Sequence, residues 1–335
     1  MKPKVYVTRK IPEVGIKLLK KFCDVNYRDE VPPPSREELL DAVDDVDAIY
    51  CTLNERIDKE VMDKAGKLKV VGTMSVGVDH IDVEYATSKG IYVVHTPGVL
   101  TETVADHTWA LLLATARRVV EADKTIRDGK WEIPWAPTMM LGYDVYGKTL
   151  GVIGVGRIGS AVARRAKGFN MRVLYYDIVR RRDLEEELGI EYVELDKLLR
   201  ESDFVTLHVP LTPETKGLIK ERELRLMKKT AILVNTSRGA VVDQRALTRA
   251  LQEGWIAGAG LDVFEKEPIP VDDPLLKLEN VVLTPHIGSA SHDTRNKMAE
   301  YVADGIIKVL RGERPDNLFN PDVIEVRSLD EVKII

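Results

Sequence analysis

A glycine-rich segment in the middle of the chain has the residue types that bind the phosphates of a dinucleotide. The apolar run Thr149–Ile153 predicts a strand and residues 160–167 predict a helix. Glycine at three positions between them allows a tight turn, close approach of the backbone to a pyrophosphate and close helix–strand packing. We therefore predict a Rossmann-type cofactor site. The segment consists of Gly154, Val155, Gly156, Arg157, Ile158 and Gly159.

The residues after the next predicted strand bear on which dinucleotide binds. An apolar run over residues 171–176 ends at Asp177, 18 residues beyond the last of these glycines. A carboxylate there binds the adenosine ribose hydroxyls and would repel a 2′-phosphate, which favours NAD. Arg180, Arg181 and Arg182 follow, and arginine binds phosphate through bidentate contacts, which favours NADP. NAD and NADP both stay open as the cofactor.

Strands alternating with short helices position these motifs. One series runs from Lys4–Thr8 to Tyr92–His95, and a second runs from Lys148 to about His286. Such alternation predicts a parallel sheet covered on both faces. We expect an α/β protein with two doubly wound parallel-sheet domains, in which a Rossmann-type cofactor domain is inserted into a flavodoxin-like domain. The expected bounds are 1–99 plus 289–335 for the substrate-binding domain and 100–288 for the dinucleotide-binding domain.

Two further segments lead to separate expectations. Residues 101–128 predict one long helix that is apolar on nearly all sides, and such a helix is buried between domains or between subunits. The last residues, 328–335, show no clear element.

Composition and charge argue against several classes of protein. A formal net charge of −5 disfavours a nucleic-acid partner. No apolar run approaches the ~20 residues that span a bilayer, and the first ten residues lack the apolar core of a signal peptide, so we expect no membrane association and a cytoplasmic location. Cys23 and Cys51 are the only cysteines, and no cluster has metal-ligand spacing, so we expect no metal. Two Gln and eight Asn beside 31% charged residues suit a protein from a hot environment.

Several motifs give the sequence a specific resemblance from Lys4 to about Val323. They are Ser75–Asp79, Gly154–Gly159, Asn235–Gly239, Asp262–Pro268 and Pro285–Ser289. With them the chain resembles the D-2-hydroxyacid dehydrogenase family, and within it the glyoxylate/hydroxypyruvate reductases of hyperthermophilic archaea. The resemblance implies NAD(P)H-dependent reduction of glyoxylate to glycolate and of hydroxypyruvate to D-glycerate.

The resemblance implies a catalytic trio of Arg238, Glu267 and His286, and keto-acid reduction requires the same residue types. Arg238 and His286 each follow an apolar β-run, and ligands gather at the carboxyl ends of strands in this fold. A guanidinium can bind the substrate carboxylate and polarise the carbonyl. A histidine is a suitable proton donor, and a glutamate can orient the imidazole and favour its charged form.

The resemblance also implies further contacts. The amides of Val76 and Gly77 should bind the substrate carboxylate, and the Leu53 side chain should pack against the C3 end of the substrate. We expect a homodimer with the 101–128 helix in its interface. Trp135 either reaches the partner's site or covers its own subunit. Other expected cofactor contacts are His208, Val209, Pro210, Thr236, Ser237, Asp262 and Gly288, and Ser289 is expected to contact the substrate.

Related functions stay open at this point. A D-3-phosphoglycerate dehydrogenase shares the core, although many carry a regulatory domain that this chain is too short to contain. Formate dehydrogenases pair the histidine with glutamine, so Glu267 argues against that activity. A D-lactate dehydrogenase is an alternative because pocket size cannot be inferred from sequence. A dinucleotide-sensing corepressor is the alternative from another class. The side chains of the other histidines are interpreted as structural: His80, His95, His107, His208 and His292. For His208 the resemblance implies a cofactor contact through the backbone.

Overall fold

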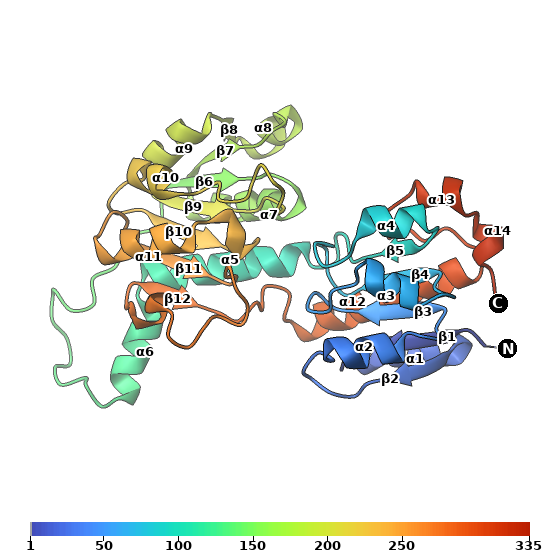
Figure 1. Cartoon of the computed structure of the whole chain (residues 1–335). Helices are drawn as coiled ribbons and strands as arrows, with labels where there is room; N and C mark the ends of the chain where they lie inside the picture. Colours follow the sequence, from blue (N-terminus) through green and yellow to red (C-terminus); the bar gives the residue numbers. More distant parts are fainter. Residues whose placement is uncertain (1) are drawn as a thin grey trace. The chain divides into compact units, whose positions relative to one another are not determined.

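The computed structural model describes residues 2–335 and divides into two compact units (Figure 1). Unit 1 comprises the residues up to Leu100 together with Ala290–Ile335, and unit 2 comprises Thr101–Ser289. Unit 2 is therefore an insertion in unit 1. Within residues 2–335, no helix combines the length and apolar character needed to cross a membrane.

Unit 1 is built on a five-stranded parallel sheet in the order β2-β1-β3-β4-β5. This is the flavodoxin-like order, as expected. Helix α12 (His292–Leu310) returns from unit 2 and packs against α1 and β4. The other elements are β1 (Lys4–Val7), α1 (Glu13–Phe22), β2 (Asp24–Tyr27), α2 (Arg36–Ala42), β3 (Ala48–Cys51), α3 (Lys59–Lys64), β4 (Val70–Thr73), α4 (Val83–Ser88), β5 (Tyr92–Val94), α13 (Val323–Val326) and α14 (Leu329–Val332).

The last residues of the chain, in which the sequence showed no clear element, include the short helix α14. Helix α14 begins with a capping box in which Ser328 donates its N–H to Glu331 at 2.7 Å. Val332 is buried, and the Ile334 N–H donates to the Leu310 carbonyl at 2.8 Å. The helix is a single turn, too short for an apolar periodicity to reveal it.

Unit 2 is built on a seven-stranded parallel sheet in the order β12-β11-β10-β9-β6-β7-β8. Counted from β6, the strands follow the Rossmann order, which confirms the predicted fold class. Helices α5 (Thr101–Ala116) and α7 cover one face, and α9, α10 and α11 cover the other. The elements after α6 are β6 (Thr149–Ile153), α7 (Arg157–Ala166), β7 (Arg172–Tyr176), α8 (Arg182–Leu188), β8 (Glu191–Tyr192), α9 (Leu195–Glu201), β9 (Phe204–Leu207), α10 (Glu221–Leu226), β10 (Ile232–Asn235), α11 (Gln244–Gln252), β11 (Gly258–Leu261) and β12 (Val281–Leu283).

The prediction of one long helix over residues 101–128 is wrong. The segment forms α5 (Thr101–Ala116) and α6 (Val119–Arg127), separated by Arg118, which has a left-handed φ of 53°. The apolar block of α5 packs against β10 and β11 of its own unit, with Trp109 and Leu112 in the core. Helix α6 has no buried residue. Arginine rarely adopts a left-handed φ, so the sequence did not indicate this break.

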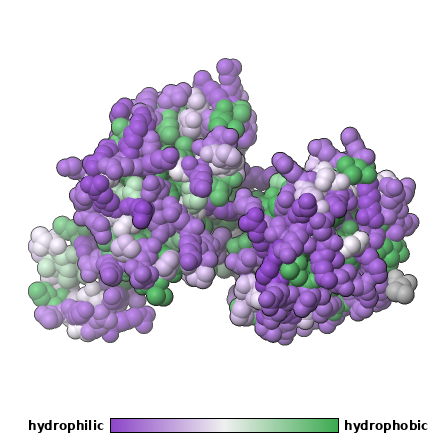
Figure 2. All heavy atoms as spheres, viewed as in Figure 1, coloured by the Kyte–Doolittle hydropathy of each residue, from purple (hydrophilic) through white to green (hydrophobic). Residues whose placement is uncertain are grey.

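Residues 131–146, here called the arm, form no helix or strand and join α6 to β6 (Figure 1). Its last part is tied to α5, because the Tyr143 N–H donates to the Ala116 carbonyl at 2.8 Å. Large apolar side chains lie exposed on the arm and on α6 (Figure 2). They are Val119, Val120, Ile126, Trp131, Ile133, Trp135, Met139, Leu141, Tyr143 and Tyr146.

Candidate active site

The predicted glycine-rich segment forms a sharp turn between β6 and α7. Gly156 is the N-cap of α7, and a Cβ added to it would meet no atom within 4 Å. A Cβ on Gly159 would lie 1.9 Å from the Gly154 carbonyl oxygen, so the strand and helix approach too closely for any side chain. Open space beside the N-terminus of α7 is the cradle that a pyrophosphate needs. The turn therefore fits a dinucleotide.

Asp177 lies beside this turn, as its spacing predicted. It follows β7, and its Oδ2 accepts a hydrogen bond from the Val155 N–H at 2.8 Å. The carboxylate is thus at the position where it can bind ribose hydroxyls.

The neighbouring arginines are already engaged with acidic side chains. Arg180 donates to both oxygens of Glu185, at 2.8 and 2.9 Å, and Arg181 donates to Asp183 at 2.6 and 2.9 Å. Glu185 also accepts a hydrogen bond from Tyr175 Oη at 2.7 Å. The hydrogen bonds from Arg180 and then Tyr175 lower the pKa of Glu185 to about 2. A 2′-phosphate would have to compete with these carboxylates for both arginines.

Residues after β9 and β10 lie at the same carboxyl edge of the sheet as the turn. A Cβ on Gly154 would lie 2.9 Å from the His208 carbonyl and from Val209 Cγ1, so β9 ends directly against the glycine turn. Thr236 Oγ1 lies 2.8 Å from Thr108 Oγ1, and Ser237 Oγ donates to Asn235 Oδ1 at 2.8 Å. The Pro210 carbonyl accepts from Thr215 Oγ1 at 2.6 Å. These predicted cofactor contacts therefore share the carboxyl edge of the sheet with the glycine turn.

His286 and Glu267 form a hydrogen-bonded pair. His286 Nδ1 lies 2.6 Å from Glu267 Oε2 and donates, because an ionised carboxylate only accepts. Glu267 Oε1 accepts the Phe264 N–H at 3.0 Å. Burial alone would raise the pKa of Glu267, but the hydrogen bond from His286 and the nearby charges, including that of Arg238, lower it. Glu267 is thus ionised, and Nε2 is the imidazole nitrogen that remains for a substrate.

Arg238 follows β10 and lies next to the segment that carries Glu267. Its carbonyl accepts the Asn235 side-chain amide at 2.9 Å, and its Nη1 donates to the Ser237 carbonyl at 2.8 Å. A Cβ on the adjacent Gly239 would lie 1.9 Å from the Phe264 carbonyl carbon, so the two segments touch through their backbones. Unit 2 therefore brings a cation, a carboxylate and an imidazole together at one edge of its sheet.

The remaining predicted substrate residues come from other segments of the chain. Val76 and Gly77 follow β4 in unit 1, where their carbonyls accept hydrogen bonds from the His95 ring at 2.9 Å and from Ser75 Oγ at 2.6 Å. Leu53 lies in the turn after β3, also in unit 1. Ser289 is the last residue of unit 2. Trp135 lies on the arm with 75% of its surface exposed.

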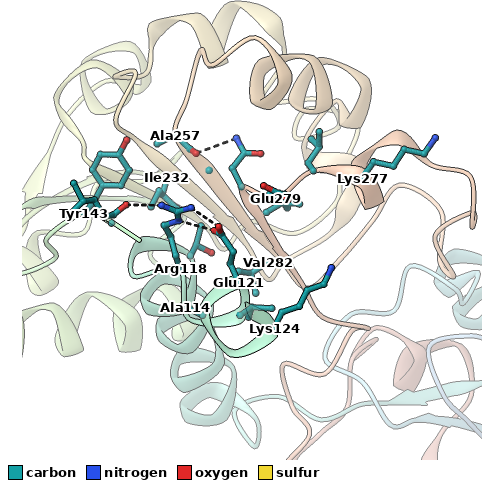
Figure 3. A pocket seen from close by; sticks show the side chains of 18 of the residues that line it. Ala114, Arg118, Glu121, Lys124, Tyr143, Ile232, Ala257, Lys277, Glu279 and Val282 are labelled. Carbon is teal, nitrogen blue, oxygen red and sulfur yellow. Dashed lines mark hydrogen bonds and ion pairs between the residues drawn. The ribbon is translucent and has the colours of Figure 1, made fainter. Parts of the chain in front are cut away.

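A cavity of about 720 Å³ lies at the opposite edge of the unit 2 sheet (Figure 3). Its lining includes Ile232, Gly258 and Val281, the first residues of β10, β11 and β12, together with Arg118 and Glu121. Because the strands are parallel, their amino ends lie away from the His286 edge. The cavity is therefore separate from the candidate active site. Within residues 2–335, no three His, Cys, Asp or Glu side chains are grouped to hold a metal ion.

Comparison with known proteins shows the family of this chain. Residues 109–288 match the model of the D-isomer specific 2-hydroxyacid dehydrogenase NAD binding domain. A glyoxylate reductase of Korarchaeum cryptofilum is 62% identical over 327 residues, which cover 98% of each chain.

Solved structures agree with this assignment. An NADPH-dependent glyoxylate/hydroxypyruvate reductase from Sinorhizobium meliloti, in complex with NADP and malonate, has a TM-score of 0.83 and 33% identity, covering 96% of this chain and 98% of its own. A D-lactate dehydrogenase from Aquifex aeolicus, complexed with NAD and lactic acid, also has a TM-score of 0.83 and 33% identity, covering 95% of this chain and 99% of its own. The family resemblance inferred from the sequence motifs is confirmed. The chain therefore belongs to the D-isomer specific 2-hydroxyacid dehydrogenase family, as an NAD(P)-dependent dehydrogenase.

Proposed function

We propose that the protein reduces glyoxylate to glycolate and hydroxypyruvate to D-glycerate, with His286 as the proton donor. The observation that carries this proposal is the 2.6 Å hydrogen bond between His286 and Glu267, next to Arg238 at the carboxyl edge of a Rossmann sheet. The names of the relatives from Korarchaeum cryptofilum and Sinorhizobium meliloti support these two substrates.

Arg238, Glu267 and His286 each have a separate role in the proposed reduction. The Arg238 guanidinium binds the substrate carboxylate and polarises the adjacent carbonyl. When bound, the reduced nicotinamide supplies the hydride to the carbonyl carbon. The carbonyl π electrons move to oxygen, which takes the proton from His286 Nε2. Glu267 holds Nδ1–H throughout and stabilises the imidazolium form before the transfer.

The remaining site residues have proposed roles as well. We assign the cofactor phosphates to the N-terminus of α7 and the adenosine ribose to Asp177. We assign substrate contacts to the Val76 and Gly77 amides, the Leu53 side chain and Ser289. Asp177 favours NADH, and the pairing of Arg180 and Arg181 with acidic neighbours disfavours NADPH.

We also propose a homodimer in which a second copy covers the arm and α6. Exposed apolar area costs roughly 25 cal/mol per Å², and contiguous patches of this kind mark interaction sites. The cavity of Figure 3 is lined by α6 and by Leu141 and Tyr143 of the arm, so it lies within the surface that a partner would cover. Cys23 and Cys51 are buried free thiols, which suits the reducing conditions of the cytoplasm, where we place the protein.

An absorbance assay at 340 nm and elevated temperature tests the proposed function. It crosses NADH and NADPH with glyoxylate, hydroxypyruvate, pyruvate and 3-phosphohydroxypyruvate. We expect fast oxidation with the first two acids and a higher rate with NADH. The variant His286→Ala should lose at least about 100-fold in kcat while still binding NADH.

Each other outcome of this assay points to a different function. Preference for pyruvate would indicate a D-lactate dehydrogenase, and preference for 3-phosphohydroxypyruvate would indicate a D-3-phosphoglycerate dehydrogenase. Cofactor binding without turnover of any of the four acids would contradict the proposal and favour a sensing role.

A further inference from the structure

The Asp262 carboxylate holds the segment that carries His286 from both sides. Asp262 follows β11 and is 1% exposed. Its Oδ1 accepts hydrogen bonds from Thr284 Oγ1 at 2.7 Å and from the Ile287 N–H at 2.8 Å, and its Oδ2 accepts the Gly288 N–H at 2.8 Å. Its backbone carbonyl accepts the His286 N–H at 2.9 Å. One residue thus binds the chain before, at and after His286.

This binding matters because His286 has an unfavourable backbone conformation. Its φ is +55°, a left-handed value that few residues other than glycine adopt. Such a conformation persists only where the surrounding structure over-determines it, and it costs on the order of 1–3 kcal/mol. The Asp262 hydrogen bonds supply that constraint, so the direction of the His286 ring depends on the position of the Asp262 carboxylate.

A second histidine contacts the same carboxylate from α5. His107 Nε2 lies 3.0 Å from Thr284 Oγ1 and 3.3 Å from Asp262 Oδ1. The Thr284 hydroxyl gives its hydrogen to Asp262, so its oxygen offers only a lone pair to His107. The carboxylate likewise only accepts. His107 Nε2 must therefore carry a hydrogen and donate it to this pair of oxygens.

The electrostatics agree with this direction of donation. Burial alone would raise the pKa of Asp262, but hydrogen bonds from His107, Thr284 and the Ile287 N–H outweigh it and lower the pKa. A buried carboxylate that loses a donor becomes costly to keep ionised. His107 is thus one of the groups that hold the charge in place.

We propose that His107 is a positioning residue, which anchors the Asp262 carboxylate and Thr284 and through them orients His286 for proton donation. This inference rests on the proposed role of His286. His107 therefore has a function beyond the structural role that the sequence indicated. His107 itself is not assigned any contact with substrate or cofactor.

Two substitutions separate positioning from simple packing. His107→Leu removes the donor and leaves an apolar side chain, whereas His107→Gln keeps an amide N–H close to the position of Nε2. His292→Leu is a matched control, because His292 is exposed at the start of α12 in unit 1. The wild type and each variant are compared by kcat, KM for glyoxylate, Kd for NADH from fluorescence titration, and Tm.

We expect kcat of His107→Leu to fall at least tenfold, while Kd for NADH changes less than threefold. His107→Gln should recover kcat to within threefold of the wild type, and His292→Leu should match the wild type. Thr284→Val combined with His107→Leu should lower kcat no further than the worse of the two single variants, because both act through one carboxylate.

Three results would overturn the positioning role. They are full kcat in His107→Leu, equal loss in His107→Gln and His107→Leu, or additive losses with Thr284→Val. An active wild type with any of these results leaves the proposed function intact. Absence of glyoxylate and hydroxypyruvate turnover in the wild type would instead refute the proposed function, and the inference that rests on it.

Discussion

His208 and Glu267 are two titratable side chains near the carboxyl edge of the unit 2 sheet, and their surroundings lower the pKa of both, which keeps one neutral and the other charged. Glu267 accepts hydrogen bonds from His286 and from the Phe264 N–H, and its pKa is lowered, so it stays charged. His208 Nε2 is out of contact with solvent and has no hydrogen-bond partner, and burial lowers the pKa of His208 to about 3. Burial of the ring nitrogen therefore favours the neutral form of His208.

This low pKa predicts that acid destabilises the fold through His208. In the unfolded chain the imidazole titrates near 6.5, so below this pH the unfolded state binds a proton that the folded state does not bind. The contribution of neutral His208 to the free energy of unfolding is complete above pH 6.5 and is lost progressively as pH falls toward 3. The unfolding free energy of the wild type should rise with pH more steeply than that of His208→Asn between pH 5 and 6.5, by up to about 1.4 kcal/mol per pH unit.

Unfolding in guanidinium chloride at several pH values measures the slope of the unfolding free energy against pH for the wild type and for His208→Asn. Equal slopes for the wild type and His208→Asn would show that His208 gains a proton in the folded state or is already solvated.

At the scale of elements, the turn from β6 to α7 decides both packing and cofactor binding, and two of its glycines separate these roles. A Cβ added to Gly159 would lie 1.9 Å from the Gly154 carbonyl oxygen, whereas a Cβ added to Gly156 would meet no atom within 4 Å. Gly156 also has an ordinary φ of −66°, so alanine fits there without backbone strain.

We predict opposite effects for alanine at these positions. Gly159→Ala should lower the unfolding free energy by at least about 2 kcal/mol, because the clash involves backbone rather than a flexible side chain. Gly156→Ala should unfold within about 0.5 kcal/mol of the wild type, yet its Cβ fills the proposed phosphate cradle. Its Kd for NADH should rise about tenfold, a change of about 1.4 kcal/mol. Unchanged NADH affinity in Gly156→Ala would move the phosphates away from this turn.

At the scale of the whole molecule, the arm is a segment with several large apolar side chains exposed. Trp135 is 75% exposed, and Ile133 and Leu141 are 59% and 63% exposed. The last part of the arm is held, since Arg118 Nη1 donates to the Leu141 carbonyl at 3.3 Å and Tyr146 Oη accepts from the Asn170 side chain at 2.7 Å. An exposed apolar segment that is anchored through its last residues is suited to a fixed interface.

Light scattering after size-exclusion chromatography should therefore give twice the mass of one chain. Replacing Ile133 and Leu141 together by Asp should yield a monomer with unchanged secondary structure, because two buried charges would have to be desolvated in the interface. Val271→Asp is the control, since Val271 is 96% exposed in unit 2 but lies outside the arm. A dimer that survives the double substitution would put the interface elsewhere.

The sequence by itself determined the fold class, the glycine turn with Asp177, and which strands carry Arg238 and His286. These features depend on local patterns, namely apolar runs of strand length and glycines whose positions are set by backbone contact. Parallel strands then bring their carboxyl ends to one edge, so residues that follow strands were predictable as neighbours.

Only the tertiary structure decided the features that depend on contacts between distant segments. Helix α5 approaches β11 and β12 through side-chain packing, and no pattern around His107 indicates that its Nε2 meets Asp262 and Thr284. The break at Arg118 follows from a left-handed residue that carries no local signature. Several acidic residues lie near Arg180 in the sequence, and the formation of helix α8 determines that Glu185 is the one that pairs with it. Such outcomes depend on packing and charge in three dimensions, which spacing along the chain does not encode.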